Sequence, residues 1–275
     1  MNSLFEIDTE KCKRDGICAA VCPLKLITVS EEDKLPLPID KAEKQCIRCG
    51  QCVAACPYGA FSLNVMKPEE CAPFDAKPLP SAEQAKSFLT SRRSIRVYKK
   101  QPVDRETLAD IIDTARYAPT AVNIQPVKWL VIENADEVNR LAGLVVDWMR
   151  NVIKEDPELA KGLGMKRFVA DWEAGEDRIC RGAPHLIIAH ANGAIAAAQS
   201  SCSIALTYLE LAAFSKGLGA CWAGFFHRAA TLYPPITQAL NLPEGHQVFG
   251  AMLVGYPRYR YYCIPQRKKA AVTWR

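Results

Sequence analysis

Seven of the twelve cysteines in this chain lie within 45 residues, between Cys12 and Cys56. The run from Cys46 to Pro57 has the spacing C-x2-C-x2-C-x3-C-P. Three closely spaced thiolates can hold one [4Fe–4S] cluster, and the fourth, next to the proline, can ligate a second cluster. A zinc site needs two cysteine pairs separated by a longer insert, so this spacing fits zinc badly. The cysteines therefore predict iron–sulfur chemistry.

An internal repeat supports this interpretation. Residues 12–29 (CKRDGICAAVCPLKLITV) are similar to residues 46–65 (CIRCGQCVAACPYGAFSLNV), and each cysteine loop is followed by an apolar run that can cover a cluster. Because the last cysteine of each loop ligates the other cluster, the repeat predicts two crossed sets of ligands. One set is Cys22, Cys46, Cys49 and Cys52, and the other contains Cys12, Cys18 and Cys56.

The first repeat lacks its second cysteine, and Asp15 stands in that place. The Cys12/Cys18/Cys56 cluster is therefore expected to have Asp15 as a carboxylate ligand, to have a water or hydroxide ligand, or to contain only three irons (3Fe–4S). Alternatively, Asp15 is a solvated turn residue, because Asp-Gly is a dipeptide typical of turns. The N-terminal part resembles ferredoxins with two 4Fe–4S clusters over its whole length and departs from them only at Asp15.

The length of 275 residues suits one small and one medium domain. We predict a two-cluster ferredoxin domain over residues 1–65 and an extended linker over residues 66–84, which contain four prolines and no periodicity. Residues 85–275 form the second domain.

The second domain is predicted to mix helices and strands without regular alternation. No G-x-G-x-x-G motif follows a strand, so a Rossmann domain is not expected. Three helices are expected. One begins near Ser81, and a second begins after an N-cap at Asp104. The third spans residues 194–216 and is ended by Gly217 and Gly219. The expected strands are residues 127–133, 185–191 and 247–256.

Three segments of this domain could bind an anionic, planar cofactor. Residues 92–96 (RRSIR) offer three guanidinium groups, which bind phosphate bidentately, and a hydroxyl group. Residues 118–126 (APTAVNIQP) form a rigid turn with hydroxyl and amide groups. Residues 217–225 (GLGACWAGF) contain small residues where a planar ring could approach the backbone.

In this order and spacing, the three segments resemble the nitroreductase family of FMN flavoproteins, over about residues 86–275. The order of a ferredoxin domain before a nitroreductase domain also resembles a known fused subgroup. The resemblance implies an α+β protein in which a ferredoxin-like two-cluster domain precedes an FMN-dependent nitroreductase-type domain with three α/β layers.

The resemblance also implies which residues contact FMN. The segment that grips the FMN phosphate and the pyrimidine edge contains Arg92, Arg93, Ser94 and Arg96. The turn that reaches the flavin from the partner subunit of a homodimer contains Pro119, Thr120, Ala121 and Asn123. The stretch whose backbone N–H approaches the reactive flavin nitrogen contains Trp222, Ala223 and Gly224. The C-terminal phosphate contacts are Arg267 and Lys268. Many relatives carry an acidic residue at the position of Gly224, so only a backbone role transfers there.

The net charge of +5 is placed mainly in the second domain, and the last 18 residues contain six Lys or Arg and no acid. Phosphate contacts explain this basic tail without nucleic acid.

The apolar region around residues 194–214 is broken by polar residues, which argues against a membrane span. The polar, acidic N-terminus does not look like a secretory signal, so a cytoplasmic protein is expected.

These observations predict an oxidoreductase that passes electrons through two clusters to FMN and on to a small acceptor such as a nitroaromatic, a quinone or an activated alkene. No catalytic side chain is assigned, and the four histidines are expected to be isolated, which fits an enzyme whose cofactor does the chemistry. The donor is expected to be a ferredoxin or NAD(P)H. The alternatives are a non-enzymatic electron-transfer partner, or an NAD(P)H-dependent, reductively dehalogenating or flavin-fragmenting member of the same family.

Overall fold

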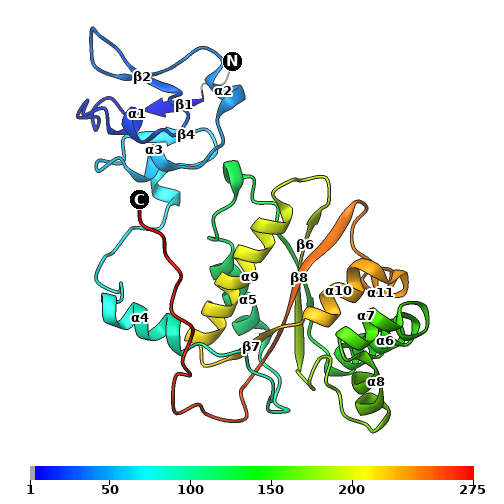
Figure 1. Cartoon of the computed structure of the whole chain (residues 1–275). Helices are drawn as coiled ribbons and strands as arrows, with labels where there is room; N and C mark the ends of the chain where they lie inside the picture. The colour runs from blue at the N-terminus through cyan, green and yellow to red at the C-terminus, as the bar shows by residue number, and fades with distance from the viewer. Residues whose placement is uncertain (1–3) are drawn as a thin grey trace. The chain divides into compact units, whose positions relative to one another are not determined.

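The computed structural model describes residues 4–275 and divides into two compact units (Figure 1). The first unit runs to Leu79 and includes Val122–Ile124, and the second unit contains Pro80–Ala121 and Gln125–Arg275. The boundary between Leu79 and Pro80 falls inside the predicted linker. The first three residues of the predicted ferredoxin domain lie outside the described residues.

The first unit is built from short elements. Two antiparallel strand pairs join β1 (Phe5–Ile7) to β4 (Phe61–Leu63) and β2 (Ile27–Val29) to β3 (Pro36–Pro38). The helices are α1 (Ile17–Val21), α2 (Ala42–Gln45) and α3 (Gln51–Ala54). A 3-10 turn, η1 (Pro68–Glu70), follows, so the predicted linker is not extended throughout.

The two cysteine loops have the same backbone geometry. Helix α1 begins after Gly16, with φ 73°, and α3 begins after Gly50, with φ 74°. Both glycines are in the left-handed region, which residues with a side chain reach only at a cost. The small core beneath the loops includes Phe5 and Phe61, whose ring centroids are 4.6 Å apart. The sequence repeat is therefore also a structural repeat.

The second unit contains one four-stranded antiparallel sheet in the order β5-β6-β8-β7. Its strands are β5 (Lys128–Ile132), β6 (His185–Asn192), β7 (Gly219–Trp222) and β8 (His246–Gly255). Its longer helices are α4 (Ala82–Ser91), α5 (Arg105–Ala115), α6 (Ala135–Glu155), α8 (Met165–Glu173), α9 (Ala198–Ser215) and α10 (Gly224–Leu232). The shorter ones are η2 (Ala121–Asn123), α7 (Pro157–Gly162) and α11 (Pro234–Leu240).

Helices cover both faces of this sheet (Figure 1). Successive residues of a strand point to opposite faces. Accordingly, Ile188 of β6 belongs to the core shared with α6, α8, α10 and α11, whereas Ile187 belongs to the core shared with α5 and α9. The near-continuous burial of β6 follows from this arrangement. The predicted three-layer domain is thus confirmed.

Several helix starts and strands lie close to the positions predicted from the sequence. The side chain of Ser81 caps α4 by accepting from the backbone N–H of Gln84 at 3.2 Å. Asp104 caps α5 in the same way, accepting from the N–H of Thr107 at 2.7 Å. The three predicted strands correspond to β5, β6 and β8.

Two predictions around α9 need correction. The helix begins at Ala198 rather than at residue 194, because residues 193–197 form a turn segment after the end of β6. Gly217, with φ 72°, does end the helix, but Gly219 is the first residue of β7. The sequence analysis missed β7, whose four residues GACW are too short to show a period.

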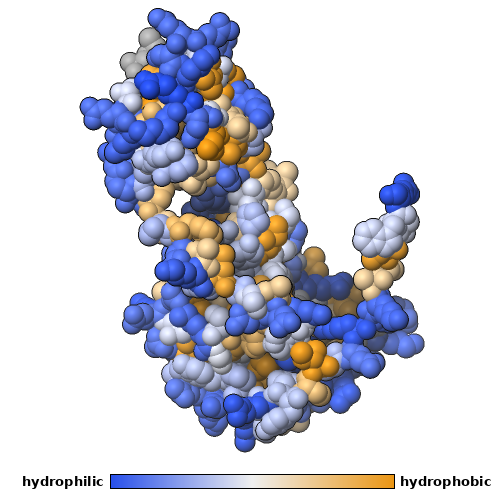
Figure 2. All heavy atoms as spheres, turned by 90° about the vertical axis from the view of Figure 1, so that its left-hand side faces the viewer, coloured by the Kyte–Doolittle hydropathy of each residue, from blue (hydrophilic) through white to orange (hydrophobic). Residues whose placement is uncertain are grey.

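The chain after Tyr256 has no regular helix or strand beyond isolated bridging, and residues 258–275 are exposed. Figure 2 shows the end of this segment projecting from the surface of its unit. Among the helices of residues 4–275, none has the length and apolar character needed to cross a bilayer.

Candidate functional site

Two cavities of the first unit are each lined by one of the predicted sets of ligands. The lining side chains of one cavity include Cys22, Cys46, Cys49 and Cys52. Those of the other include Cys12, Asp15, Cys18 and Cys56. Each set combines residues from both repeats, because the last cysteine of each repeat lies beside the loop of the other.

Thiol sulfurs in both cavities accept backbone hydrogen bonds. The N–H of Leu26 donates to Sγ of Cys22 at 3.3 Å, and the N–H of Ala60 donates to Sγ of Cys56 at the same distance. These are equivalent positions of the two repeats. The N–H of Arg48 donates to Sγ of Cys46 at 3.4 Å. Hydrogen bonds of this kind stabilise thiolates and tune the reduction potential of a bound cluster, so the chemistry of the donor set fits iron–sulfur clusters.

Asp15 has a second role besides lining its cavity. Its Oδ1 accepts a hydrogen bond from the N–H of Ile17 at 3.1 Å, which orders the start of α1. This contact is the turn role that the sequence left open. It occupies one carboxylate oxygen, and a metal contact would use the other. Both interpretations of Asp15 are therefore compatible with this geometry.

The two cavities differ in charge. Lys13, Arg14 and Lys34 line the cavity of Asp15. The cavity of Cys49 has apolar side chains and Gln51 instead, with no charged residue among the described residues that line it. Because nearby charge shifts the reduction potential of a cluster, these two environments should give two clusters different potentials.

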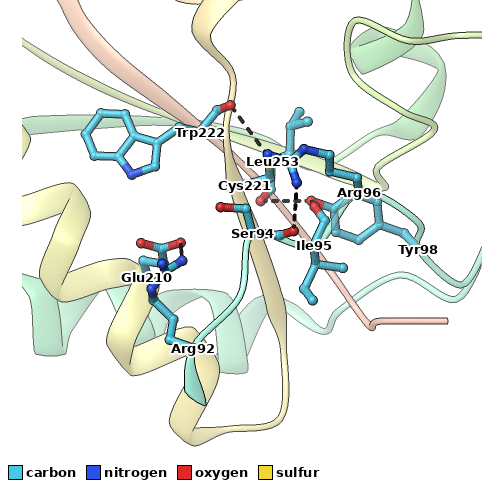
Figure 3. A network of polar contacts seen from close by, with 9 residues as sticks. All are labelled: Arg92, Ser94, Ile95, Arg96, Tyr98, Glu210, Cys221, Trp222 and Leu253. Atoms are coloured by element: carbon cyan, nitrogen blue, oxygen red, sulfur yellow. Dashed lines mark hydrogen bonds and ion pairs between the residues drawn. The ribbon is translucent and has the colours of Figure 1, made fainter. Parts of the chain in front are cut away.

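In the second unit, the arginine-rich segment 92–96 lies against β7. The N–H of Ile95 donates to the carbonyl oxygen of Ala220 at 2.9 Å, and Tyr98 Oη donates to the carbonyl oxygen of Ile95 at 2.7 Å. Gly219 permits this approach, since a Cβ there would lie 2.6 Å from Cγ1 of Ile95. Figure 3 shows Ser94 and Arg96 on this segment beside Cys221 and Trp222 of β7.

Arg92 is held by a buried carboxylate whose pairing with an arginine was not predicted from the sequence. Its Nη1 lies 2.6 Å from Oε1 of Glu210 on α9, and the two side chains are 24% and 8% exposed (Figure 3). Burial raises the pKa of Glu210, and the neighbouring Arg92 partly offsets this rise. A glutamate inside an apolar helix is the sequence signal that could have revealed the pair.

Arg93 offers an unused donor. Its Nε is buried and makes no hydrogen bond within residues 4–275. A buried polar group without a partner is costly. A bound oxyanion would satisfy this N–H, so the donor fits a phosphate-bearing group at residues 92–96.

The stretch Trp222–Gly224 lines a cavity of about 360 Å³ together with Arg96. The N–H of Ala223 already donates to the carbonyl oxygen of Ala251 at 2.9 Å. Gly224 is the first residue of α10, where the N–H groups of the first turn have no intrahelical partner. The structure thus brings Arg96 and Gly224 to one cavity, as the sequence predicted for residues that contact one flavin.

This cavity also contains residues that the sequence analysis missed. Three further arginines line it, and no motif marks them because two come from the loop between α8 and β6 and the third from α10: Arg178, Arg181 and Arg228. Their convergence depends on the packing of α8 and α10 around the sheet.

The remaining residues that were predicted to contact the flavin do not line this cavity within one chain. Pro119, Thr120 and Ala121 belong to the second unit, while Asn123 lies in the segment that groups with the first unit. Val122 and Asn123 have positive φ values of 45° and 54°, in the left-handed region that residues with a side chain seldom adopt. Within the described residues, no hydrogen bond or ion pair joins the exposed Arg267 and Lys268 to residues 92–96. The flavin contacts of all these residues remain predictions.

The prediction of four isolated histidines is wrong for one pair. His190 on β6 and His246 on β8 have their Nδ1 atoms 2.9 Å apart. The register between the two strands brings these residues to the same end of the sheet. Burial, followed by the charge of His246, lowers the pKa of His190.

Comparison with known proteins agrees with both parts of this description. Residues 89–256, more than half of the chain, match the model of the nitroreductase family. Residues 4–57 match the model of the 4Fe-4S dicluster domain.

Two curated relatives are similar to the second unit. A protein of Archaeoglobus fulgidus, named as a candidate NADH dehydrogenase/NAD(P)H nitroreductase, is 25% identical over 183 residues, which are 64% of this chain and 87% of that protein. A protein of Methanothermobacter thermautotrophicus with the same name is 27% identical over 173 residues, which are 62% and 75% of the two chains.

Solved structures share the fold. A nitroreductase with bound FMN from Bacteroides fragilis aligns with a TM-score of 0.56 and 21% identity, covering 69% of this chain and 97% of that one. A nitroreductase with bound FMN from Desulfitobacterium hafniense aligns with a TM-score of 0.55 and 21% identity, covering 68% and 97%. These similarities confirm the fold expected for the second unit.

Proposed function

This chain belongs to the nitroreductase family, and on that basis we propose that it is an iron–sulfur flavoprotein oxidoreductase that passes electrons through two clusters to FMN and on to a small acceptor. The observation that carries the proposal is the pair of cavities, each lined by four candidate ligands drawn from both repeats. A domain built this way before a nitroreductase domain is suited to deliver single electrons to a flavin.

The proposed cluster ligands follow from the cavities. Cys22, Cys46, Cys49 and Cys52 hold one 4Fe–4S cluster. Cys12, Cys18 and Cys56 hold the other, with Asp15 as its fourth ligand. A carboxylate oxygen is a harder ligand than a thiolate, so the iron at Asp15 is the more exchangeable one. Thiolates are the metal-binding form of cysteine and persist in a reducing compartment, which supports a cytoplasmic location.

FMN is the proposed flavin, because the structural neighbours from Bacteroides fragilis and Desulfitobacterium hafniense contain it. When bound, FMN supplies an electron carrier that can exchange one or two electrons. Arg92, Arg93 and Ser94 bind its phosphate, and Arg96 donates to its pyrimidine edge. The unpaired N–H groups at Gly224 stabilise negative charge on the ring. Arg267 and Lys268 provide the remaining phosphate contacts.

The proposed assembly is a homodimer in which Pro119, Thr120, Ala121 and Asn123 reach the flavin of the partner subunit. A two-fold axis would use the same turn twice, once for each flavin. Sedimentation of the FMN-loaded protein at low micromolar concentration should give a dimer. A monodisperse monomer that retains FMN would rule this assembly out.

The acceptor is proposed to be a nitroaromatic, a quinone or an activated alkene. An alternative electron donor to reduced ferredoxin is NAD(P)H, which is favoured by the names of the two archaeal relatives. An alternative to an enzyme is a protein that only transfers electrons to a partner protein. Turnover of a small acceptor by the isolated protein would separate the enzyme from the carrier.

The decisive experiment reduces the anaerobically purified protein with NADH, NADPH and reduced ferredoxin in parallel. The absorbance bands of the clusters and of the flavin are followed in each case, and a nitroaromatic is added at the end. The proposal expects the cluster bands to bleach before the flavin band with reduced ferredoxin. Bleaching of the flavin alone by NAD(P)H would show that the clusters are not on the input path.

A further inference from the structure

The cavity at Gly224 is lined by four arginines, and the proposed flavin contacts involve only one of them. Arg96 is assigned to the pyrimidine edge, but Arg178, Arg181 and Arg228 line the same cavity. Arg178 is neutralised, because its Nη1 lies 2.7 Å from Oδ2 of Asp171. Within residues 4–275, no ion pair or side-chain hydrogen bond engages the guanidinium of Arg181 or of Arg228. Two positive charges are therefore left without a counterion.

The backbone holds Arg181 in a costly conformation. Its φ of 61° is in the left-handed region, which an arginine seldom adopts. The carboxylate of Asp177 enforces this turn by accepting from the N–H groups of Ile179, Cys180 and Gly182 at 2.8, 2.9 and 2.9 Å. Strain of this kind persists only where the surrounding structure determines it, and it concentrates at ligand-binding positions. The turn thus places Arg181 at the cavity.

Arg228 approaches the cavity from α10. It lies one helical turn after Gly224, and residues four apart share one face of a helix. The positive end of the α10 dipole is at Gly224, so the helix and the Arg228 side chain favour the same charge. Burial raises the pKa of the Cys221 thiol, and the positive charges of Arg96 and Arg181, which line the same cavity, partly offset this rise. The arginines therefore converge on one volume.

The remaining wall is apolar. Leu163, Ile179 and Phe225 line the cavity, and the ring of Phe225 meets that of Phe168 edge-on at 4.8 Å. The cavity of about 360 Å³ also contains Arg96 and Gly224, which are assigned to the flavin, so a ligand at Arg181 and Arg228 would lie next to the flavin ring. An apolar wall that includes the aromatic rings of Trp222 and Phe225, beside two unpaired guanidinium groups, is complementary to a planar aromatic molecule that carries an anionic group.

We propose that Arg181 and Arg228 bind the anionic group, a carboxylate or a phosphate, of the planar molecule that exchanges electrons with the flavin. Asp177 acts through Arg181 and is a positioning residue. The identity of the ligand as a redox partner rests on the proposed function, whereas the anion site rests on the cavity alone. The anion belongs either to an acidic acceptor or to the pyrophosphate of a nicotinamide dinucleotide donor.

The test compares two probes of one shape, 4-nitrobenzoate and the neutral 4-nitrobenzamide, by calorimetric titration of the oxidised full-length protein. The benzoate should bind about 10- to 100-fold more tightly than the amide, as expected for a charge-assisted contact. Arg181→Gly and Arg228→Gln should each abolish this preference. Glycine relieves the positive φ at residue 181, so loss of binding there would not reflect misfolding. The control is Arg140→Gln, an exposed arginine of α6 that pairs with Glu137 at 2.7 Å outside the cavity, and it should keep the preference.

A parallel titration with NAD⁺, which carries the pyrophosphate and cannot reduce the protein, identifies the source of the anion. If the two substitutions weaken NAD⁺ and leave the benzoate unchanged, the site serves the donor. If neither probe depends on Arg181 and Arg228, the proposal is overturned. It is also overturned if Arg181→Gly releases FMN, since the cavity would then hold the flavin phosphate. A chain that never contains FMN would refute the proposed function, and the benzoate titration would still decide on the anion site.

Discussion

Nη1 of Arg92 lies 2.6 Å from Oε1 of Glu210, and this ion pair joins residues that are 118 positions apart in the sequence. It fixes the start of the arginine-rich segment to the buried face of α9 (Figure 3). A guanidinium has five N–H donors, so Arg92 can bind Glu210 and still offer donors to a phosphate. Substitution of Arg92 should therefore affect both stability and flavin binding, and the two effects can be separated.

Arg92→Ala should weaken FMN binding about 10- to 100-fold, because a charge-assisted hydrogen bond contributes about 1.5–3 kcal/mol. It should also lower the unfolding free energy of the flavin-free protein by about 3 kcal/mol, since it leaves the carboxylate of Glu210 buried and unpaired. Arg267→Ala should weaken FMN binding similarly without loss of stability, because Arg267 is exposed. Fluorescence titration with FMN and urea unfolding provide the two measurements.

The double variant Arg92→Ala/Glu210→Gln supplies the control for this prediction. Removal of both charges should restore much of the stability and none of the flavin affinity. Unchanged FMN affinity in Arg92→Ala would mean that Arg92 is only the structural partner of Glu210.

Glu210 also predicts a pH dependence of stability. Burial raises its folded-state pKa above the usual 4.5, and Arg92 does not fully cancel the effect. A group with a raised folded-state pKa contributes stability below its unfolded pKa, and this contribution is lost as the pH rises through the folded pKa. The unfolding free energy of the native chain relative to Glu210→Gln should therefore decrease from pH 4.5 upward. An increase over the same range would show that pairing with Arg92 outweighs burial.

Gly219 should be required for the flavin segment to dock on β7. An alanine Cβ there would lie 2.6–2.8 Å from three side-chain atoms of Ile95. Gly219→Ala should lower the unfolding free energy by about 1–3 kcal/mol, as overpacking does, and should reduce FMN content. Gly162→Ala is the matched control, because no atom beyond its chain neighbours and its own helix lies within 4 Å of a Cβ at that position and Gly162 does not line the flavin cavity. Equal loss of FMN from both variants would contradict the role assigned to Gly219.

Asp15 should make its cluster the labile one. Mild oxidation should remove one iron from the Cys12/Cys18/Cys56 cluster and give the EPR signal of a 3Fe–4S form, while the other cluster persists. Asp15→Cys should suppress this loss. Asp15→Asn keeps an acceptor for the N–H of Ile17 and removes the carboxylate, so it separates ligation from the turn role. If both clusters lose iron together and the cysteine variant behaves like the native chain, Asp15 is a turn residue.

The cluster domain was the more predictable part because its information is local. Gly16 and Gly50 occupy equivalent places in the repeats, and their positive φ values give both loops one shape. The spacing of the cysteines then determines which side chains can meet. The capped starts of α4 and α5 were predictable for the same reason, since Ser81 and Asp104 act within one turn.

The flavin-domain site was less predictable because its contacts are long-range. Glu210 pairs with Arg92 only after α9 packs on the sheet, and Arg181 and Arg228 line one cavity only after the loop before β6 and helix α10 pack together. Neither pair forms a recognisable motif, because the two residues of each pair are far apart in the sequence. The four-residue strand β7 was missed because its place is fixed by pairing with β8, through registers such as Cys221 with Leu253. Tertiary packing decided these elements, and local propensity did not.

The content of metal, sulfide and flavin in anaerobically purified protein tests the central claim most directly. The account predicts seven or eight irons, with matching acid-labile sulfide, and one FMN per chain, as expected for two clusters of which one contains Asp15. Zinc in place of iron and sulfide, or iron–sulfur clusters without any flavin, would contradict it.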